Sequence, residues 1–185
     1  MRPYKPFWLV VSSKPQNIDA ATSQCMVLPA IKVGYHVQIW VDADACPKAV
    51  KQVLFRAAER LAVTTTLVAN QFIATPASKF ISSLQVPAGL DVADDLIVEK
   101  MNPGDLVVTA DIPLADQVIT KGGWALNPRG MLYTTENIKD HLSRRDMFDE
   151  LRTIGAVSGG PNPLGKKDVQ AFANALDRFL AQHAR

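Results

Sequence analysis

The sequence predicts an α/β fold in which three layers, α/β/α, surround a mostly parallel central sheet. Short apolar runs typical of buried strands alternate with segments of helical periodicity, and prolines and glycines separate them. In such folds, helices connect parallel strands and cover both faces of the sheet. Ligands then bind beyond the carboxyl ends of the strands, which is where this sequence places several acidic residues.

The first predicted strand covers residues 37–42 (VQIWVD), an apolar run that ends in an acid. Pro47 opens the following helix at a position where its missing N–H costs nothing. A second strand is predicted over 63–69. The helix between these strands has a buried stripe with i, i+3, i+4 and i+7 spacing. That stripe consists of Val50, Val53, Leu54, Ala57 and Leu61.

The rest of the chain continues the alternation of strands and helices after an irregular stretch over 70–90. Turn signals such as Asn102-Pro103-Gly104 separate the elements. The predicted elements are a short helix around 78–84, a helix over 91–101, a strand at 106–110, a helix from Pro113 to Gly122-Gly123, a short strand at 124–126, and helices near 135–152 and 166–183.

Composition and length predict one globular domain. The chain has 185 residues, of which 48% are hydrophobic and 21% charged, as in ordinary globular proteins. No apolar run reaches the roughly 20 residues that a membrane-spanning helix needs. The two cysteines, Cys25 and Cys46, offer no disulfide framework and no metal-binding spacing. We therefore expect a cytoplasmic protein that does not enter the membrane.

Residues 1–36 differ from the rest because they lack a sustained period and contain four prolines. We expect them to form a poorly ordered or partly docked extension, with 37–185 as a single α/β domain. Of the formal charge of +2, the extension carries +3, which leaves −1 for residues 37–185. Global charge thus gives little support to nucleic-acid binding by the domain, and only a local basic patch would favour it.

Acidic residues gather where the predicted strands end. Asp42 terminates the first strand, and Asp111 follows the strand at 106–110. Because parallel strands bring their carboxyl ends together, we expect these two side chains to converge. Asp94 and Asp95 lie on the helix between these strands, and Asp116 lies one turn into the helix after Asp111. For either strand-end aspartate alone, a helix N-cap is an equally good explanation.

Converging carboxylates raise one another's pKa unless a cation neutralises them. Mg²⁺ and Mn²⁺ are the natural cations, because they prefer oxygen ligands and keep several waters. Such a metal activates water and stabilises negative charge on a phosphodiester. The acid pattern therefore indicates a Mg²⁺ or Mn²⁺ site suited to the hydrolysis of nucleic acid.

Three basic residues are candidates for substrate binding. Lys48 lies on the first helix near Asp42, and Arg129 follows a short strand in a turn from which it could reach a phosphate. Lys166 follows a glycine-rich loop whose backbone N–H groups could contact phosphate. Each has a simpler alternative. Lys48 could lie on a solvated helix face, Arg129 could tie loops together, and the loop before Lys166 could be a plain linker. Cys46 is better explained as a small buried residue than as a reactive thiol.

Several motifs of this chain, taken in order, resemble the bacterial YaiI/YqxD family over about residues 37–182. This family is similar to the PIN-like nucleases in fold and acid placement. The resemblance therefore implies a PIN-like domain and a metal-dependent nuclease that acts on RNA or another nucleic acid. The motifs are 40–47 (WVDADACP), 91–98 (DVADDLIV), 104–115 (GDLVVTADIPLA), 125–130 (ALNPRG), 159–161 (GGP) and 168–176 (DVQAFANAL).

The PIN-like pattern, carried over to this chain, implies that Asp42, Asp111 and Asp116 are metal ligands. Asp94 or Asp95 would supply the carboxylate from the helix, where PIN-like nucleases often have a glutamate. The resemblance leaves open which of the two aspartates matches. Asp42, Asp95, Asp111 and Asp116 are accordingly the expected catalytic residues.

Two other functions remain open. The pair Asp42 and Asp44 resembles the nucleophile and acid of phosphatases of the haloacid-dehalogenase type, but their further Ser/Thr and Lys motifs are not recognisable in 63–104. The third possibility is a nucleic-acid-binding or regulatory module whose acid cluster performs no catalysis.

Overall fold

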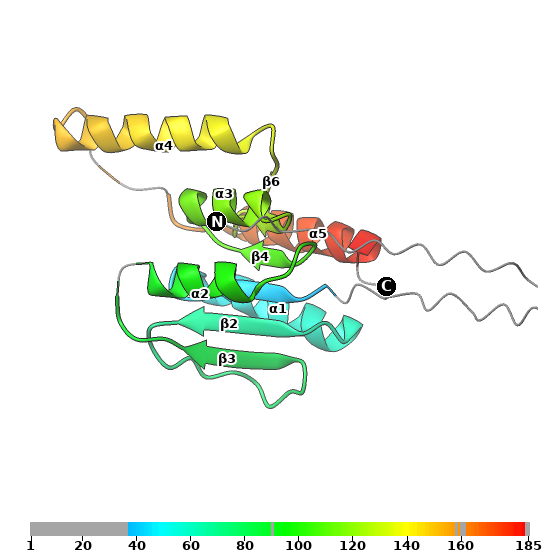
Figure 1. Ribbon diagram of the computed structural model, residues 1–185. Helices are drawn as coiled ribbons and strands as arrows, with labels where there is room; N and C mark the ends of the chain where they lie inside the picture. Colours follow the sequence, from blue (N-terminus) through cyan, green and yellow to red (C-terminus); the bar gives the residue numbers. More distant parts are fainter. Residues whose placement is uncertain (1–36, 90, 158, 160–161, 184–185) are drawn as a thin grey trace, which may run out of the picture. The chain divides into compact units, whose positions relative to one another are not determined.

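The computed structural model describes residues 37–89, 91–157, 159 and 162–183. A six-stranded sheet with the order β3-β2-β1-β4-β5-β6 forms its centre (Figure 1). Strands β1 to β5 are paired in parallel, and β6 runs antiparallel to β5. The strands are β1 (Ile39–Asp42), β2 (Thr65–Ala69), β3 (Ile81–Gln85), β4 (Leu106–Val108), β5 (Trp124–Leu126) and β6 (Leu132–Tyr133).

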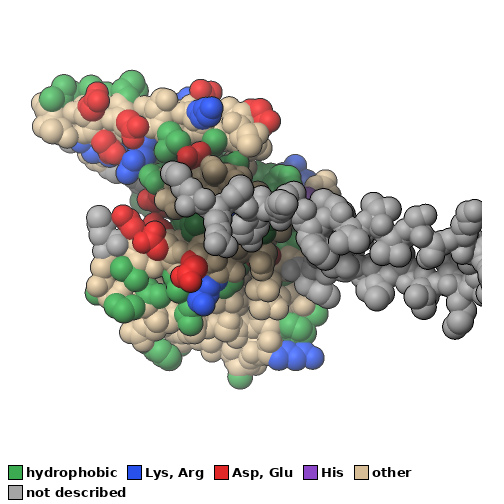
Figure 2. All heavy atoms as spheres, in the orientation of Figure 1, with side chains coloured by type: hydrophobic (Ala, Val, Ile, Leu, Met, Phe, Trp, Pro, Cys, Tyr) green, Lys and Arg blue, Asp and Glu red, His purple; other side chains and the backbone are tan. Residues whose placement is uncertain are grey.

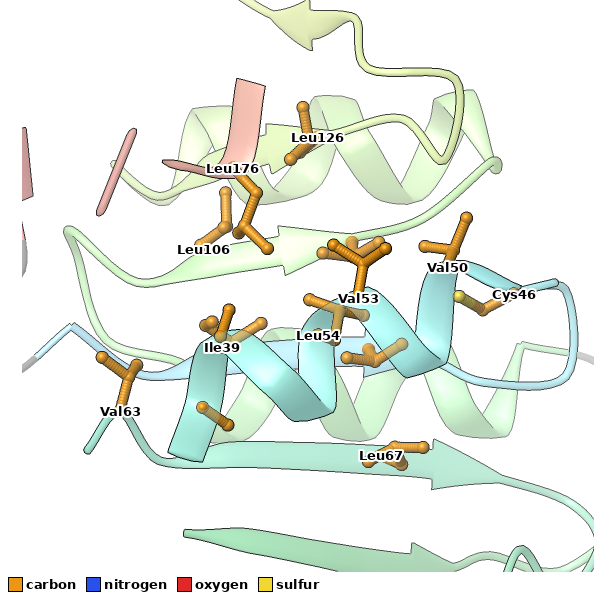
Figure 3. Packing of buried hydrophobic residues seen from close by; sticks show 14 of the residues in the cluster. Ile39, Cys46, Val50, Val53, Leu54, Val63, Leu67, Leu106, Leu126 and Leu176 are labelled. Atoms are coloured by element: carbon orange, nitrogen blue, oxygen red, sulfur yellow. The ribbon is translucent and has the colours of Figure 1, made fainter. Parts of the chain in front are cut away.

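Helices cover both faces of this sheet, which confirms the predicted three-layer α/β/α fold. Alternation along β1 sends Ile39 and Val41 to one face and Trp40 to the other. On the first face α1 and α5 pack together on the sheet, and Figure 3 shows α1 residues such as Leu54 on this core. Residues of α2, α3 and α4 cover the second face. The helices are α1 (Lys48–Leu61), α2 (Val92–Lys100), α3 (Ile112–Thr120), α4 (Ile138–Thr153) and α5 (Lys166–His183).

The predicted short helix around 78–84 is wrong, because this segment contains strand β3. Of its five residues only Ile81 is buried, so the strand lacks the apolar pattern that would mark it in the sequence. Parallel pairing with β2 holds it in place, and the hydroxyl groups of Thr66 and Ser82 lie 3.1 Å apart across the pair. Such long-range pairing overrides local propensity.

Smaller differences concern the ends of elements. Pro47 is the N-cap of α1 rather than its first residue, and Leu61, at the last turn, is 42% exposed instead of buried. Strand β6 was not predicted, since it has only two residues. The predicted extension, residues 1–36, lies outside the described residues. Within the described part, no helix is both long enough and apolar enough to cross a membrane.

Candidate functional site

The sheet order brings two acidic strand ends together. The chain runs outward from β1 to β3 and then returns to β4, so β1 and β4 are neighbours at the point where the order reverses. Such a switch point is the usual ligand site of an open α/β sheet. Asp42 is the last residue of β1, and Asp111 is the N-cap of the helix that follows β4. Asp42 lies two residues after Trp40, so alternation directs it towards the α2 and α3 layer.

A cleft of about 380 Å³ opens at this edge of the sheet. Figure 2 shows acidic side chains gathered at the end of the molecule towards which the strand arrows of Figure 1 point. The cleft thus collects side chains from elements that are far apart in the sequence. Its lining consists of Asp42, Asp44, Ala45, Asn70, Gly89, Asp91, Ala93, Asp94, Ala110 and Asp111.

Thr109 connects the two strand-end aspartates. Its buried hydroxyl group donates to Oδ2 of Asp42 at 3.1 Å and accepts from the backbone N–H of Asp111 at 2.9 Å. Oδ1 of Asp111 accepts from the backbone N–H of Leu114 at 2.9 Å, which caps α3. These bonds fix both carboxyl groups on the protein side and use one oxygen of each.

Burial and mutual repulsion raise the pKa of two of these acids. The pKa of Asp42 rises chiefly because the group is buried, although hydrogen bonds from Thr109 and the Ala45 backbone oppose the rise. Burial likewise raises the pKa of Asp94 to about 6, and the charges of Asp42 and Asp111 add to the effect. The repulsion shows that carboxylates from β1, α2 and α3 act on one another across the cleft.

No basic side chain among the described residues forms an ion pair with Asp42, Asp94 or Asp111. Within the described part of the chain, the repulsion at the cleft is therefore not neutralised by a paired basic side chain. The donor atoms are all carboxylate oxygens, which suit Mg²⁺ or Mn²⁺. Within the described chain, no group of three or more acidic, His or Cys side chains lies close enough together to enclose a metal ion. The set fits a cation that keeps part of its water shell better than one enclosed by protein ligands.

The structure separates the two aspartates that the sequence left undecided. Asp94 is half-buried and lines the cleft, whereas its neighbour Asp95 is exposed and does not. Successive helical residues point about 100° apart, so only one of them can face the sheet. Asp116, in the second turn of α3, is half-buried and is also not part of the cleft lining.

The predicted basic residues lie elsewhere. Arg129 donates to Oδ2 of Asp168 at 2.9 Å and also to the backbone carbonyl of Asn162. It thus ties the β5–β6 turn to the start of α5, which is the alternative considered above. Lys48 and Lys166 are exposed first residues of α1 and α5, and neither is part of the cleft lining.

The hydrogen bonding of Asp44 and the burial of Cys46 indicate structural roles for both residues. Oδ2 of Asp44 accepts from the backbone N–H of Asn70 at 2.7 Å and so joins the β1–α1 loop to the end of β2. Cys46 is 5% exposed, and burial raises the pKa of its thiol to about 12. A thiol with such a pKa stays protonated at neutral pH and is inert.

Asn70 and Tyr133 are among the residues of this region, like Thr109, that were not predicted from the sequence. Asn70 directly follows β2 and lines the cleft, so the strand-end rule would have found it had it been applied to polar residues other than acids. Tyr133 is buried on β6 and accepts from Nδ2 of Asn127 at 3.0 Å. Its pKa is raised chiefly by burial, with a contribution from the charge of Asp111. No local pattern marks a tyrosine on a two-residue strand.

In comparisons with known proteins, a family profile and several similar proteins match this chain over most of its length. The profile described as "Uncharacterized BCR, YaiI/YqxD family" matches residues 40–182. The UPF0178 protein of Shewanella amazonensis is 61% identical over 146 residues, which cover 79% of this chain and 98% of that protein. The UPF0178 protein of Janthinobacterium sp. is 58% identical over 146 residues, which cover 79% and 97%. That of Syntrophotalea carbinolica is 58% identical over 147 residues, which cover 80% and 99%.

Proposed function

This chain belongs to the YaiI/YqxD family, as its motifs predicted, and on this premise we propose that it is a divalent-metal-dependent nuclease acting on RNA. One observation carries the proposal. Carboxylates from three separate elements, Asp42, Asp94 and Asp111, surround one cleft at the switch point of the sheet. The resemblance of this family to the PIN-like nucleases in fold and acid placement supports RNA as the substrate.

Asp42, Asp94 and Asp111 would hold the Mg²⁺ or Mn²⁺ ion. When bound, the ion supplies Lewis acidity that activates water and stabilises charge on a phosphodiester. Thr109 orients Asp42 by donating to one of its oxygens, and the α3 N-terminus orients Asp111 in the same way. Asp95 and Asp116 are not part of this set, because neither lines the cleft.

The bonding of Asp44 favours a nuclease over a phosphatase of the haloacid-dehalogenase type. In that phosphatase, Asp44 would have to protonate the leaving oxygen, a role commonly worth about 10²–10⁴-fold in rate. Here its carboxylate holds the backbone of Asn70 at 2.7 Å. Asp44 is therefore better explained as a residue that shapes the cleft.

The test combines metal binding with cleavage. We expect Mn²⁺ to give heat of binding in calorimetry and the purified protein to cleave single-stranded or structured RNA slowly with Mn²⁺. Asp111→Asn should weaken the binding of Mn²⁺ and abolish cleavage, while the fold persists because asparagine is an equally good N-cap. Asp44→Asn is the matched control from the same cleft and should lower cleavage less.

Two results would contradict the proposal. If wild-type protein gives no heat of binding and no rise in Tm at millimolar Mn²⁺, the proposed metal site is wrong. Hydrolysis of p-nitrophenyl phosphate that is lost in Asp44→Asn, with a phosphoaspartate trapped at Asp42, would establish the phosphatase instead. If metal binds but no substrate is cleaved, the non-catalytic module is the better description.

A further inference from the structure

Asn70 is a cleft residue whose own hydrogen bonding is incomplete. Its amide oxygen Oδ1 is buried and accepts no hydrogen bond from the residues that the structure describes, although the residue as a whole is half-exposed and lines the cleft. Buried polar atoms are almost always paired, so an unpaired one in a cleft calls for an explanation.

The backbone of Asn70 is held on both sides. Its N–H donates to Oδ2 of Asp44 at 2.7 Å, and its carbonyl accepts from Nε2 of Gln85 at 3.4 Å. Asn70 follows β2, where Val68 is in register with Asp42 and faces the same layer of helices. Alternation therefore directs the Asn70 side chain to the face on which Asp42 lies. Rotation about the soft terminal torsion of the side chain turns the amide oxygen without any movement of this backbone.

We infer that the Asn70 carboxamide contacts the ligand of this cleft by accepting a hydrogen bond from an O–H donor on it. The carboxylates around it are acceptors when ionised and cannot serve as its donor. Because Oδ1 is buried, it would reach a ligand hydroxyl in the cleft only after this rotation of the amide. A ligand without a donor would leave it unpaired. This inference rests on the proposed function.

Two sources offer such a donor at a nuclease site. One is the 2′-hydroxyl of a ribose, which is the group that lets a protein distinguish RNA from DNA. The other is a hydration water of the cation, since Mg²⁺ keeps several waters. In the first case Asn70 selects RNA, and in the second it positions the cation.

The test compares Asn70→Ala with Asn127→Ala. Asn127, after β5, has both ends of its amide bonded, to Tyr133 and to the Arg129 backbone. We expect Asn127→Ala to lower the Tm, because it leaves partners unpaired. We expect Asn70→Ala to keep or raise the Tm, because it removes an unpaired acceptor. A Tm lowered equally by both would show that the Asn70 amide is structural and would overturn the inference.

Ligand binding then identifies the donor. Calorimetry gives the Kd for Mn²⁺ without nucleic acid, and fluorescence anisotropy in Ca²⁺ gives the Kd for one RNA strand and for its DNA equivalent. If the donor is the ribose, Asn70→Ala weakens RNA binding by roughly 3–10-fold, as the loss of one neutral hydrogen bond predicts. The Kd values for DNA and for Mn²⁺ then stay unchanged. If the donor is a hydration water, it weakens Mn²⁺ binding without nucleic acid.

Failure of this inference can be distinguished from failure of the proposed function. Wild-type protein that binds Mn²⁺ and RNA, together with an Asn70→Ala variant of unchanged affinity for both, overturns the role of Asn70 alone. Wild-type protein that binds neither overturns both.

Discussion

Removal of the Asp94 charge should stabilise the metal-free protein, although Asp94 lies in the proposed functional site. Burial and the charges of Asp42 and Asp111 raise its pKa from the ordinary value of 3.8 to about 6. The folded state therefore binds more protons than the unfolded state between these two values. It follows that the free energy of unfolding falls as pH rises through this window, and that the ionised carboxylate is a cost at neutral pH.

The size of this cost follows from the change in pKa. A rise from 3.8 to about 6 corresponds to about 3 kcal/mol at 1.36 kcal/mol per pKa unit. Because the carboxyl group is half-exposed, solvent screening reduces this to about 1.5 kcal/mol. A favourable interaction with the α2 N-terminus, about 0.5 kcal/mol, is lost in Asp94→Asn. The expected net gain is about 1 kcal/mol at pH 7.5, or roughly 2–4 °C in Tm.

Urea unfolding of Asp94→Asn at pH 7.5 and pH 4, without metal, measures this gain. At pH 4 the wild-type group is largely protonated when folded, so the two proteins should be nearly equal in stability. Asp95→Asn is the matched control, because this exposed neighbour lies in the same first helical turn but outside the cleft. A variant less stable than wild type at pH 7.5, or a gain that persists at pH 4, would refute the reasoning. Millimolar Mn²⁺ should reverse the order, because only the wild type has the full ligand set.

Two further substitutions test the hydrogen bonding behind the acids and the packing of the β5–β6 turn against α5. Thr109→Val removes a buried hydroxyl that joins Asp42 to the Asp111 backbone, so it should cost about 1–3 kcal/mol in urea unfolding and weaken Mn²⁺ binding in calorimetry. Unchanged Mn²⁺ affinity would show that Thr109 does not position the acids. Gly130→Ala should destabilise by more than about 2 kcal/mol, since a Cβ there would lie 2.5 Å from the Ala171 backbone at a φ of +86°. Gly104→Ala is its control, because Gly104 also has positive φ, +91°, but its Cβ would meet nothing within 4 Å.

Local pattern was enough to predict the layers of this fold, because buried strands and amphipathic helices carry strong periodic signals. The helix of 166–183 was predicted with the bounds of α5, owing to its apolar stripe. Strand β3 was missed because its stability comes from pairing with β2 along a mostly exposed edge, which no local period records. Strand β6 was missed because it has only two residues, which cannot show a period.

The convergence of Asp42 and Asp111 could be predicted because the rule about parallel strand ends needs no side-chain geometry. The choice between Asp94 and Asp95 could not, because it depends on the rotation of α2 about its axis. That rotation is fixed by packing, with Ile97 and Met101 buried in the same layer as Trp40. The position of Asp116 depends in the same way on how α3 packs, through Leu114 and Val118, so spacing from Asp111 was a weak guide.

The cleft electrostatics bear on the order in which ligands would bind under the proposed function. Residues 37–185 carry a formal charge of −1, and the lining of the cleft contains acidic but no basic side chains among the described residues. A phosphodiester that approaches these carboxylates is repelled by them. Burial, and then the charges of Asp42 and Asp111, raise the pKa of Asp94. A divalent cation reverses the local charge, because it is the largest single charge in such a site. Under the proposed function, the cation would thus be a condition for RNA to enter the cleft as well as for its hydrolysis. The acids expected to destabilise the free protein would then be the same ones that make its substrate binding depend on metal.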